Sequence, residues 1–128
     1  MNWRIAISCL TIVFSLSGCT PSQPQSSEVA NVVGHSQNQL LTHPPIKAVA
    51  GFYDGKQLVE YTVMVHGNLT SHDAQRIFSE ILDTISQDAN SKNMWDYYNA
   101  QLSIKSFEHG VIYTAVKNAG RPMEVSSH

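Results

Sequence analysis

The amino-acid sequence predicts a small α+β domain. We expect a two-layer sandwich with the element order ββαββ, in which one amphipathic helix covers an antiparallel-rich sheet. Three observations lead to this prediction: two β-rich segments flank an Asp-Gly pair, a long segment then repeats apolar residues at helical spacing, and two more β-rich segments follow. The 128 residues suit one domain at most, and we expect it to span residues 46–120.

The first hairpin is expected from residues 47–53 and 57–66, which an Asp-Gly pair connects. Asp-Gly between β-rich segments favours a two-residue turn, because both central residues then adopt positive φ. Such a turn pairs Ala50 with Val59. Strand alternation then places one set of apolar side chains on the core face: Ala48, Ala50, Phe52, Val59, Tyr61, Val63 and Val65.

The helix is expected over residues 70–90. Its apolar residues recur at the i, i+3, i+4 spacing of one buried stripe: Ala74, Ile77, Phe78, Ile81, Leu82 and Ile85. Thr70 or Ser71 can cap the first turn, and Asp73 lies near the positive end of the helix dipole. If the strands on either side of the helix are parallel neighbours, the helix forms a right-handed crossover between them.

The second hairpin is expected from residues 100–105 and 111–116. A three-residue loop with Gly110 in the left-handed region places Leu102 opposite Val116. The second face of the sheet is less apolar, although Leu58, Met64 and Phe107 are expected on it. We expect this face or the edge strands to receive any partner, and residues 121–128 to form a disordered tail.

The N-terminus has the pattern of a secretory signal peptide: a basic start, the largely apolar residues 5–16, and then small residues. Within it, Leu16-Ser17-Gly18-Cys19 resembles the lipobox of bacterial lipoproteins. The resemblance implies cleavage between Gly18 and Cys19 and a diacylglycerol on the Cys19 thiol, which anchors the chain in the membrane. The alternative is an ordinary secreted protein, cleaved after Ser17.

The residue after the cysteine is Thr20 and not Asp, which in a Gram-negative host implies the outer membrane, with the domain facing the periplasm. In another host the lipid implies the cell membrane. Residues 1–18 would be removed, and residues 19–45 are rich in Ser, Gln, Asn and Pro, so we expect a flexible polar tether there. Since Cys9 is cleaved off and Cys19 is lipidated, no thiol is left for a disulfide or a metal.

Composition argues against several other functions. The pI of about 6.3 and the absence of a basic run indicate that nucleic acid is not a partner. The sequence has no GxSxG, GxGxxG or Walker A motif, and its histidines lack metal-ligand spacing, so we expect no catalytic site, metal or cofactor. His66 and His72 flank one expected loop, and a catalytic role would require them to converge in a cleft.

Met94-Trp95-Asp96-Tyr97-Tyr98 is the most unusual short segment. Trp95, Tyr97 and Tyr98 are candidates for a partner-contact surface, because aromatic side chains are enriched where proteins bind one another. The alternative is that Trp95 and one tyrosine close the end of the core while the other tyrosine faces water.

We interpret the chain as a membrane-anchored periplasmic lipoprotein, a binding or scaffolding module for another cell-envelope protein. Its general plan is like that of lipoproteins used in envelope assembly, secretion, conjugation or immunity. One alternative is a small periplasmic enzyme or enzyme inhibitor. Another is a small-ligand or lipid-binding module, which would require a cavity between helix and sheet.

Overall fold

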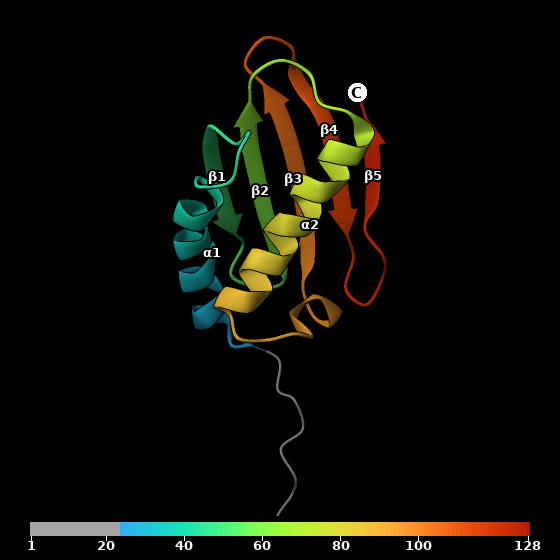
Figure 1. The fold of residues 1–128 in the computed structure, drawn as a ribbon. Coiled ribbons are helices and arrows are strands. Elements are labelled where there is room, and N and C mark those ends of the chain that lie inside the picture. Colours follow the sequence, from blue (N-terminus) through green and yellow to red (C-terminus); the bar gives the residue numbers. More distant parts are fainter. Residues whose placement is uncertain (1–23) are drawn as a thin grey trace, which may run out of the picture.

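The computed structural model describes residues 24–128 (Figure 1). The α+β class is confirmed, but the element order is αββαβββ and not ββαββ. The elements in chain order are α1 (Ser26–Leu40), β1 (Ala48–Tyr53), β2 (Leu58–Val65), α2 (Ser71–Asp88), the short 3₁₀-helix η1 (Met94–Asp96), β3 (Asn99–Ser106), β4 (Gly110–Lys117) and β5 (Glu124–Ser127).

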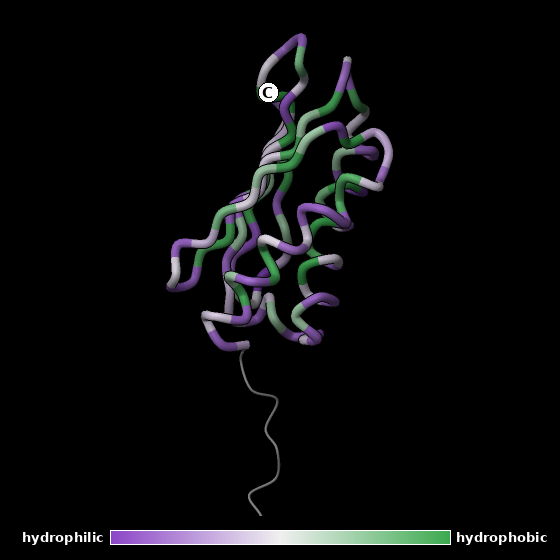
Figure 2. The backbone as a smooth tube through the Cα atoms, turned by 90° about the vertical axis from the view of Figure 1, so that its left-hand side faces the viewer, coloured by the Kyte–Doolittle hydropathy of each residue, from purple (hydrophilic) through white to green (hydrophobic). Residues whose placement is uncertain are grey.

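The five strands form one sheet in the order β1-β2-β3-β4-β5. β2 and β3 are parallel neighbours, and every other pair is antiparallel. The helix α2 connects the two parallel strands, as a crossover requires. Both helices lie on the same face of the sheet: α1 beside β1, and α2 diagonally across the strands (Figures 1 and 2).

Helix α2 agrees with the prediction. All six residues of its apolar stripe are buried between the helix and the sheet. Thr70 is the N-cap residue, and its side-chain oxygen accepts a hydrogen bond of 3.1 Å from the backbone N–H of Asp73. Capping and periodicity are both local properties of the sequence, so they can be predicted without knowledge of the tertiary structure.

Helix α1 corrects the prediction of a flexible tether over residues 19–45. Residues 26–40 are helical and pack on the domain through four buried side chains: Val29, Val33, Ser36 and Leu40. Three buried apolar side chains in a largely polar segment cannot stabilise an isolated helix of this length in water. The sheet and α2 supply the missing burial, so the helix depends on the rest of the domain.

The connection between β1 and β2 also differs from the prediction. The Oδ1 atom of Asp54 accepts hydrogen bonds at 2.8–3.0 Å from three backbone N–H groups, those of Lys56, Gln57 and Leu58. These bonds, the one from Lys56 foremost, lower the pKa of Asp54. The loop is therefore longer than two residues, and Ala50 pairs with Thr62 instead of Val59.

This change of register exchanges the two faces of β1. The shift is by an odd number of residues, so each β1 side chain lies on the face opposite to the predicted one. Gly51 faces the helices, whereas Phe52 points to the other side of the sheet and keeps 59% of its surface exposed. The predicted faces of β2 are correct, since Val59, Tyr61, Val63 and Val65 are all buried.

The second hairpin and the C-terminus bring two smaller corrections. Gly110 has the expected positive φ of 74°, but Leu102 lies opposite Ala115 and not Val116. A bulge between Ile104 and Lys105 shifts the pairing near the turn. Residues 121–128 are not a disordered tail, because Glu124–Ser127 forms β5 on the edge of the sheet.

Candidate interaction surface

The sheet face opposite the helices is covered by no other part of residues 24–128 (Figure 2). We call it the open face. Strand register and alternation assign sixteen side chains to it, none of which is buried: Ala48, Ala50, Phe52, Leu58, Glu60, Thr62, Met64, Asn99, Gln101, Ser103, Lys105, Val111, Thr114, Val116, Glu124 and Ser126. The open face therefore presents both apolar and polar side chains to solvent.

Besides the opposed pair Leu58 and Asn99, the directly opposed residues on this face form three rows across the strands. The central row consists of Ala50, Thr62, Ser103, Thr114 and Ser126, so four of its five members are hydroxyl residues. The acidic row consists of Phe52, Glu60, Gln101, Val116 and Glu124. The basic row consists of Ala48, Met64, Lys105 and Val111.

His128 extends the basic row beside β4. Its backbone N–H bonds the carbonyl of Ile112, and its Nε2 lies 2.8 Å from the Thr114 hydroxyl on the open face. Glu60, Lys105 and Glu124 take part in none of the ion pairs among residues 24–128. The two flanking rows therefore present opposite charges that have no partner within the described domain.

The open face is also shaped. A depression of about 300 Å³ lies at its β1 side, lined by Ala48, Val49, Ala50, Thr62, Met64 and Lys105. Small side chains on β1 leave this space. The neighbouring acidic row carries Phe52, the most exposed of the large apolar residues at 59%. An exposed aromatic side chain and a depression thus lie side by side on one surface.

The aromatic segment after α2 does not form a single exposed rim. Trp95 is half-buried against the core and donates a hydrogen bond of 3.0 Å from Nε1 to the carbonyl of Leu82. Tyr98 is buried, and its hydroxyl donates to the carbonyl of Pro24. Tyr97 keeps 36% exposure. These positions correspond to the core-closing alternative, with one tyrosine facing water.

His66 pairs with an acid and not with His72. Its Nδ1 atom lies 2.9 Å from the Oε1 atom of Glu108, and its ring stacks on Phe107 at 4.7 Å between centroids. Glu108 also accepts hydrogen bonds from the backbone N–H of Gly67 at 2.7 Å and from the hydroxyl of Ser106 at 2.9 Å. The Gly67 N–H first, and then these side chains, lower the pKa of Glu108 to about 2.

This cluster ties the loop before α2 to the turn between β3 and β4. The contacts of Glu108 with His66, Gly67 and Ser106 are all accounted for by a structural role, which is to hold these two loops together. Within residues 24–128, no three His, Cys, Asp or Glu side chains are grouped so that they could hold a metal ion.

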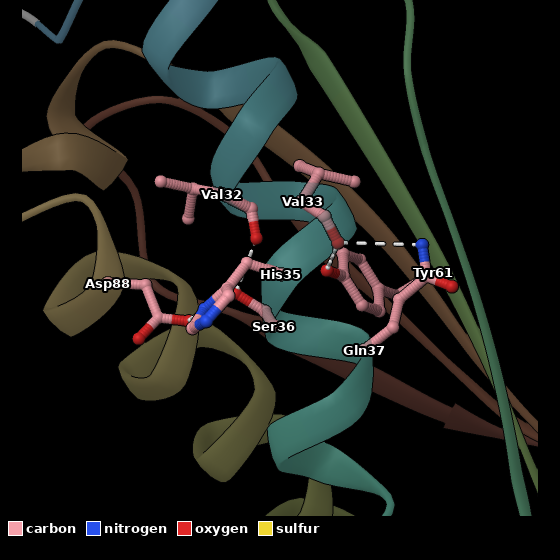
Figure 3. A network of polar contacts seen from close by, with 7 residues as sticks. All are labelled: Val32, Val33, His35, Ser36, Gln37, Tyr61 and Asp88. Carbon is pink, nitrogen blue, oxygen red and sulfur yellow. Dashed lines mark hydrogen bonds and ion pairs between the residues drawn. The ribbon is translucent and has the colours of Figure 1, made fainter.

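A polar contact joins the two helices on the covered face (Figure 3). The buried hydroxyl of Ser36 lies 2.7 Å from the carbonyl of Val32 and 2.8 Å from Oδ2 of Asp88, so two acceptors share its single proton. His35 approaches the same Asp88 oxygen at 3.5 Å. The hydroxyl of Tyr61 donates to the carbonyl of Val33, and burial raises the pKa of this tyrosine.

A second hollow, of about 1050 Å³, opens at the surface between the start of α1 and the segment after α2. Its walls include Pro24, Glu28, Asp88 and Lys92. It is wide, and most of the residues that line it are polar. The lipobox residues Gly18 and Cys19 lie outside the described residues. No helix within residues 24–128 is long and apolar enough to cross a bilayer.

Sequence reasoning assigned Phe52 to the core, whereas the structure places it on the open face. The only signal for the longer loop was Asp54, since an aspartate side chain can accept hydrogen bonds from the backbone N–H groups that follow it. It did anticipate Met64 on the second face. There Met64 is half-buried and lines the depression.

Comparison with known proteins leaves the family open. No protein-family model matches the chain, and no curated protein matches it. A solved structure described as "Crystal structure of Sex pheromone staph-cAM373 precursor" is partly similar, with a TM-score of 0.47 and 12% sequence identity. The match covers 80% of this chain but only 36% of that one. Likeness at this level carries no functional argument, so function has to follow from the chain's own residues.

Proposed function

We propose that this chain is a lipid-anchored cell-envelope protein whose domain binds a partner protein of the cell envelope and catalyses no reaction. Cys19 carries the lipid after cleavage behind Gly18, and the lipobox tetrapeptide supports this assignment. In a Gram-negative host the anchor lies in the outer membrane and the domain faces the periplasm. In another host the anchor lies in the cell membrane.

The observation that carries the proposal is the open face of the sheet. It presents the exposed apolar side chains of Phe52, Val111 and Val116 on one surface, together with charged side chains that form no ion pair within residues 24–128. Single exposed apolar residues are ordinary, but several on one sheet face with polar residues between them are typical of contact surfaces. Covering this face with a partner would remove that apolar area from water.

Anchoring makes even a weak contact effective. Helix α1 begins at Ser26, only a few positions after Cys19, so the lipid and the domain are separated by roughly 25 Å of chain at most. A short connection holds the domain close to the membrane surface. There the effective concentration of a membrane-bound partner is high.

The contact is tested with a photo-crosslinking amino acid at Phe52 of the full chain in its own host. We expect one recurrent, identifiable protein adduct. The matched control is the same amino acid at Gln75, which is exposed on the outer side of α2 and should give none. Anchored protein that forms no adduct through Phe52 would overturn the proposal.

The anchor is tested separately with Cys19→Ser. We expect the wild type to incorporate labelled fatty acid and to sediment with membranes, and the variant to lose both properties. A variant that still incorporates fatty acid would show that Cys19 is not the lipidated residue.

A further inference from the structure

We infer that the open face docks on the open face of a second copy of this chain, with a two-fold axis along the central row. The inference names the partner of the proposed contact surface and therefore rests on the proposed function. Two sheets then pack face to face as an aligned sandwich, about 10 Å apart. The contact is isologous, so each residue pairing occurs twice.

The axis determines which residues meet. A rotation of 180° about the central row keeps each strand over the same strand of the second copy and exchanges the flanking rows. The acidic row of one copy then covers the basic row of the other. Members of the central row, such as Ser103 and Thr62, meet their own counterparts. A hydroxyl both donates and accepts, so it can hydrogen-bond to its own copy.

The charges favour this axis over the alternative. Glu60 comes to face the row that contains Lys105 of the second copy, with a lateral offset of one strand spacing, about 4.8 Å. Glu124 comes over His128. A two-fold axis along β3 would instead place Lys105 against its own counterpart, which like charges disfavour. The opposite signs of the two flanking rows therefore select rotation about the central row.

The shape of the face agrees with the same axis. Phe52 of one copy comes over Ala48 of the other, where the depression of about 300 Å³ lies. An aromatic side chain that enters a pocket is the typical anchor of a protein interface. At the far side of the sheet, Val116 comes over Val111 of the second copy, and both are exposed in the single domain. The rotation thus places Phe52 at the depression of the other copy, and Val116 against Val111.

The size of the contact predicts its strength. Five strands at about 4.8 Å spacing and three rows of side chains cover roughly 500 Å² of each copy. A total of about 1,000 Å² is at the low end for specific interfaces. We therefore expect a weak dimer in dilute solution and efficient pairing when both copies are held in one membrane.

Disulfide trapping tests the axis directly. Ser103→Cys, in the middle of the central row, should form a covalent dimer in the host membrane under mild oxidation, because a residue on the axis meets itself. Thr114→Cys provides a second axis position in case the first variant folds poorly. Ser79→Cys, which is exposed on α2, is the matched control and should stay monomeric.

Monomeric Ser103→Cys and Thr114→Cys, with native circular dichroism, would overturn the inference. So would trapping of a different protein at these positions, although that result would leave the proposed function standing. Failure of the proposed function looks different, because neither the axis cysteines nor the Phe52 crosslinker would then trap any protein.

A charge exchange gives an independent test. Glu60→Lys and Lys105→Glu should each lower the dimer yield of Ser103→Cys by about fivefold, since like charges then face each other. The two substitutions together should restore the yield. Glu60 and Lys105 form no ion pair within residues 24–128, so such rescue has to act between copies. Absence of rescue in a folded double variant would contradict the pairing.

Discussion

The two helices cover the same face of the sheet but are held there in different ways. Helix α2 buries six apolar side chains in one stripe, and a hydrogen bond to Thr70 caps its first turn. Helix α1 buries three apolar side chains and one serine. Helix α2 is stabilised by its own apolar stripe, and α1 by specific contacts with its neighbours. Helices in one layer can therefore differ in how far they depend on the rest of the fold.

The contacts that hold α1 are partly polar. Ser36 bonds Asp88 on α2, and Tyr61 on β2 donates to the carbonyl of Val33. Gly51 on β1 permits the approach, because a Cβ atom there would lie 2.8 Å from the Tyr61 ring. Such polar contacts contribute less to stability than the burial of the six apolar side chains of α2. We therefore expect α1 to detach at a lower free energy than α2.

The largest expected effect is on α2. Phe78→Ala removes a fully buried ring between helix and sheet and should lower the free energy of unfolding of the whole domain by about 3–5 kcal/mol. Urea denaturation measures this change. Gln75→Ala on the exposed side of the same helix should change it by less than about 0.5 kcal/mol. Equal effects of the two substitutions would show that burial of the apolar stripe is not what stabilises α2.

A substitution beneath α1 should act on that helix alone. Gly51→Val drives a side chain into Tyr61 and should cost roughly 1–3 kcal/mol, with faster amide exchange in α1 than in α2. Gly34→Ala is the matched control, since no atom lies within 4 Å of its new Cβ. It should stabilise α1 by about 1 kcal/mol. Uniform acceleration across both helices after Gly51→Val would show that they unfold as one unit.

Loss of the hydrogen bond of Ser36 should have a smaller effect on the stability of α1. Ser36→Ala removes the hydroxyl between the carbonyl of Val32 and Asp88, and should cost about 0.5–1.5 kcal/mol. Native-state hydrogen exchange should show the loss in α1 first. Ser79→Ala, on the exposed surface of α2, serves as the control. An unchanged exchange rate in α1 would mean that apolar contacts hold this helix by themselves.

The smallest expected effect is at the loop that leads into α2. The folded-state pKa of Glu108, about 2, lies below its ordinary value of 4.5, so its contribution to stability is present above pH 4.5. It is lost as the pH falls from about 4.5 toward 2. Glu108→Gln should flatten the pH dependence of stability in this interval. Identical acid titrations of variant and wild type would contradict this role.

Particular residues show how far the fold and the surface were predictable. The six-residue stripe of α2 and the alternation of β2 are repeated locally, so the sequence predicted both elements and their buried faces. The surface was anticipated only as a second sheet face. Phe52 was assigned to the wrong side, because three hydrogen bonds to Asp54 moved the strand register by an odd number of residues.

The sequence by itself determined the α+β class, the helix α2 and the inward side of β2, since each follows from a local period of apolar residues. Only the tertiary structure decided that residues 26–40 form a helix and that β5 adds an edge strand to the sheet. It also decided which side of β1 faces out. Residues 26–40 and β5 bury too little surface of their own, so their conformation follows from the neighbours against which they pack. The outward side of β1 follows instead from the register that the three hydrogen bonds to Asp54 set.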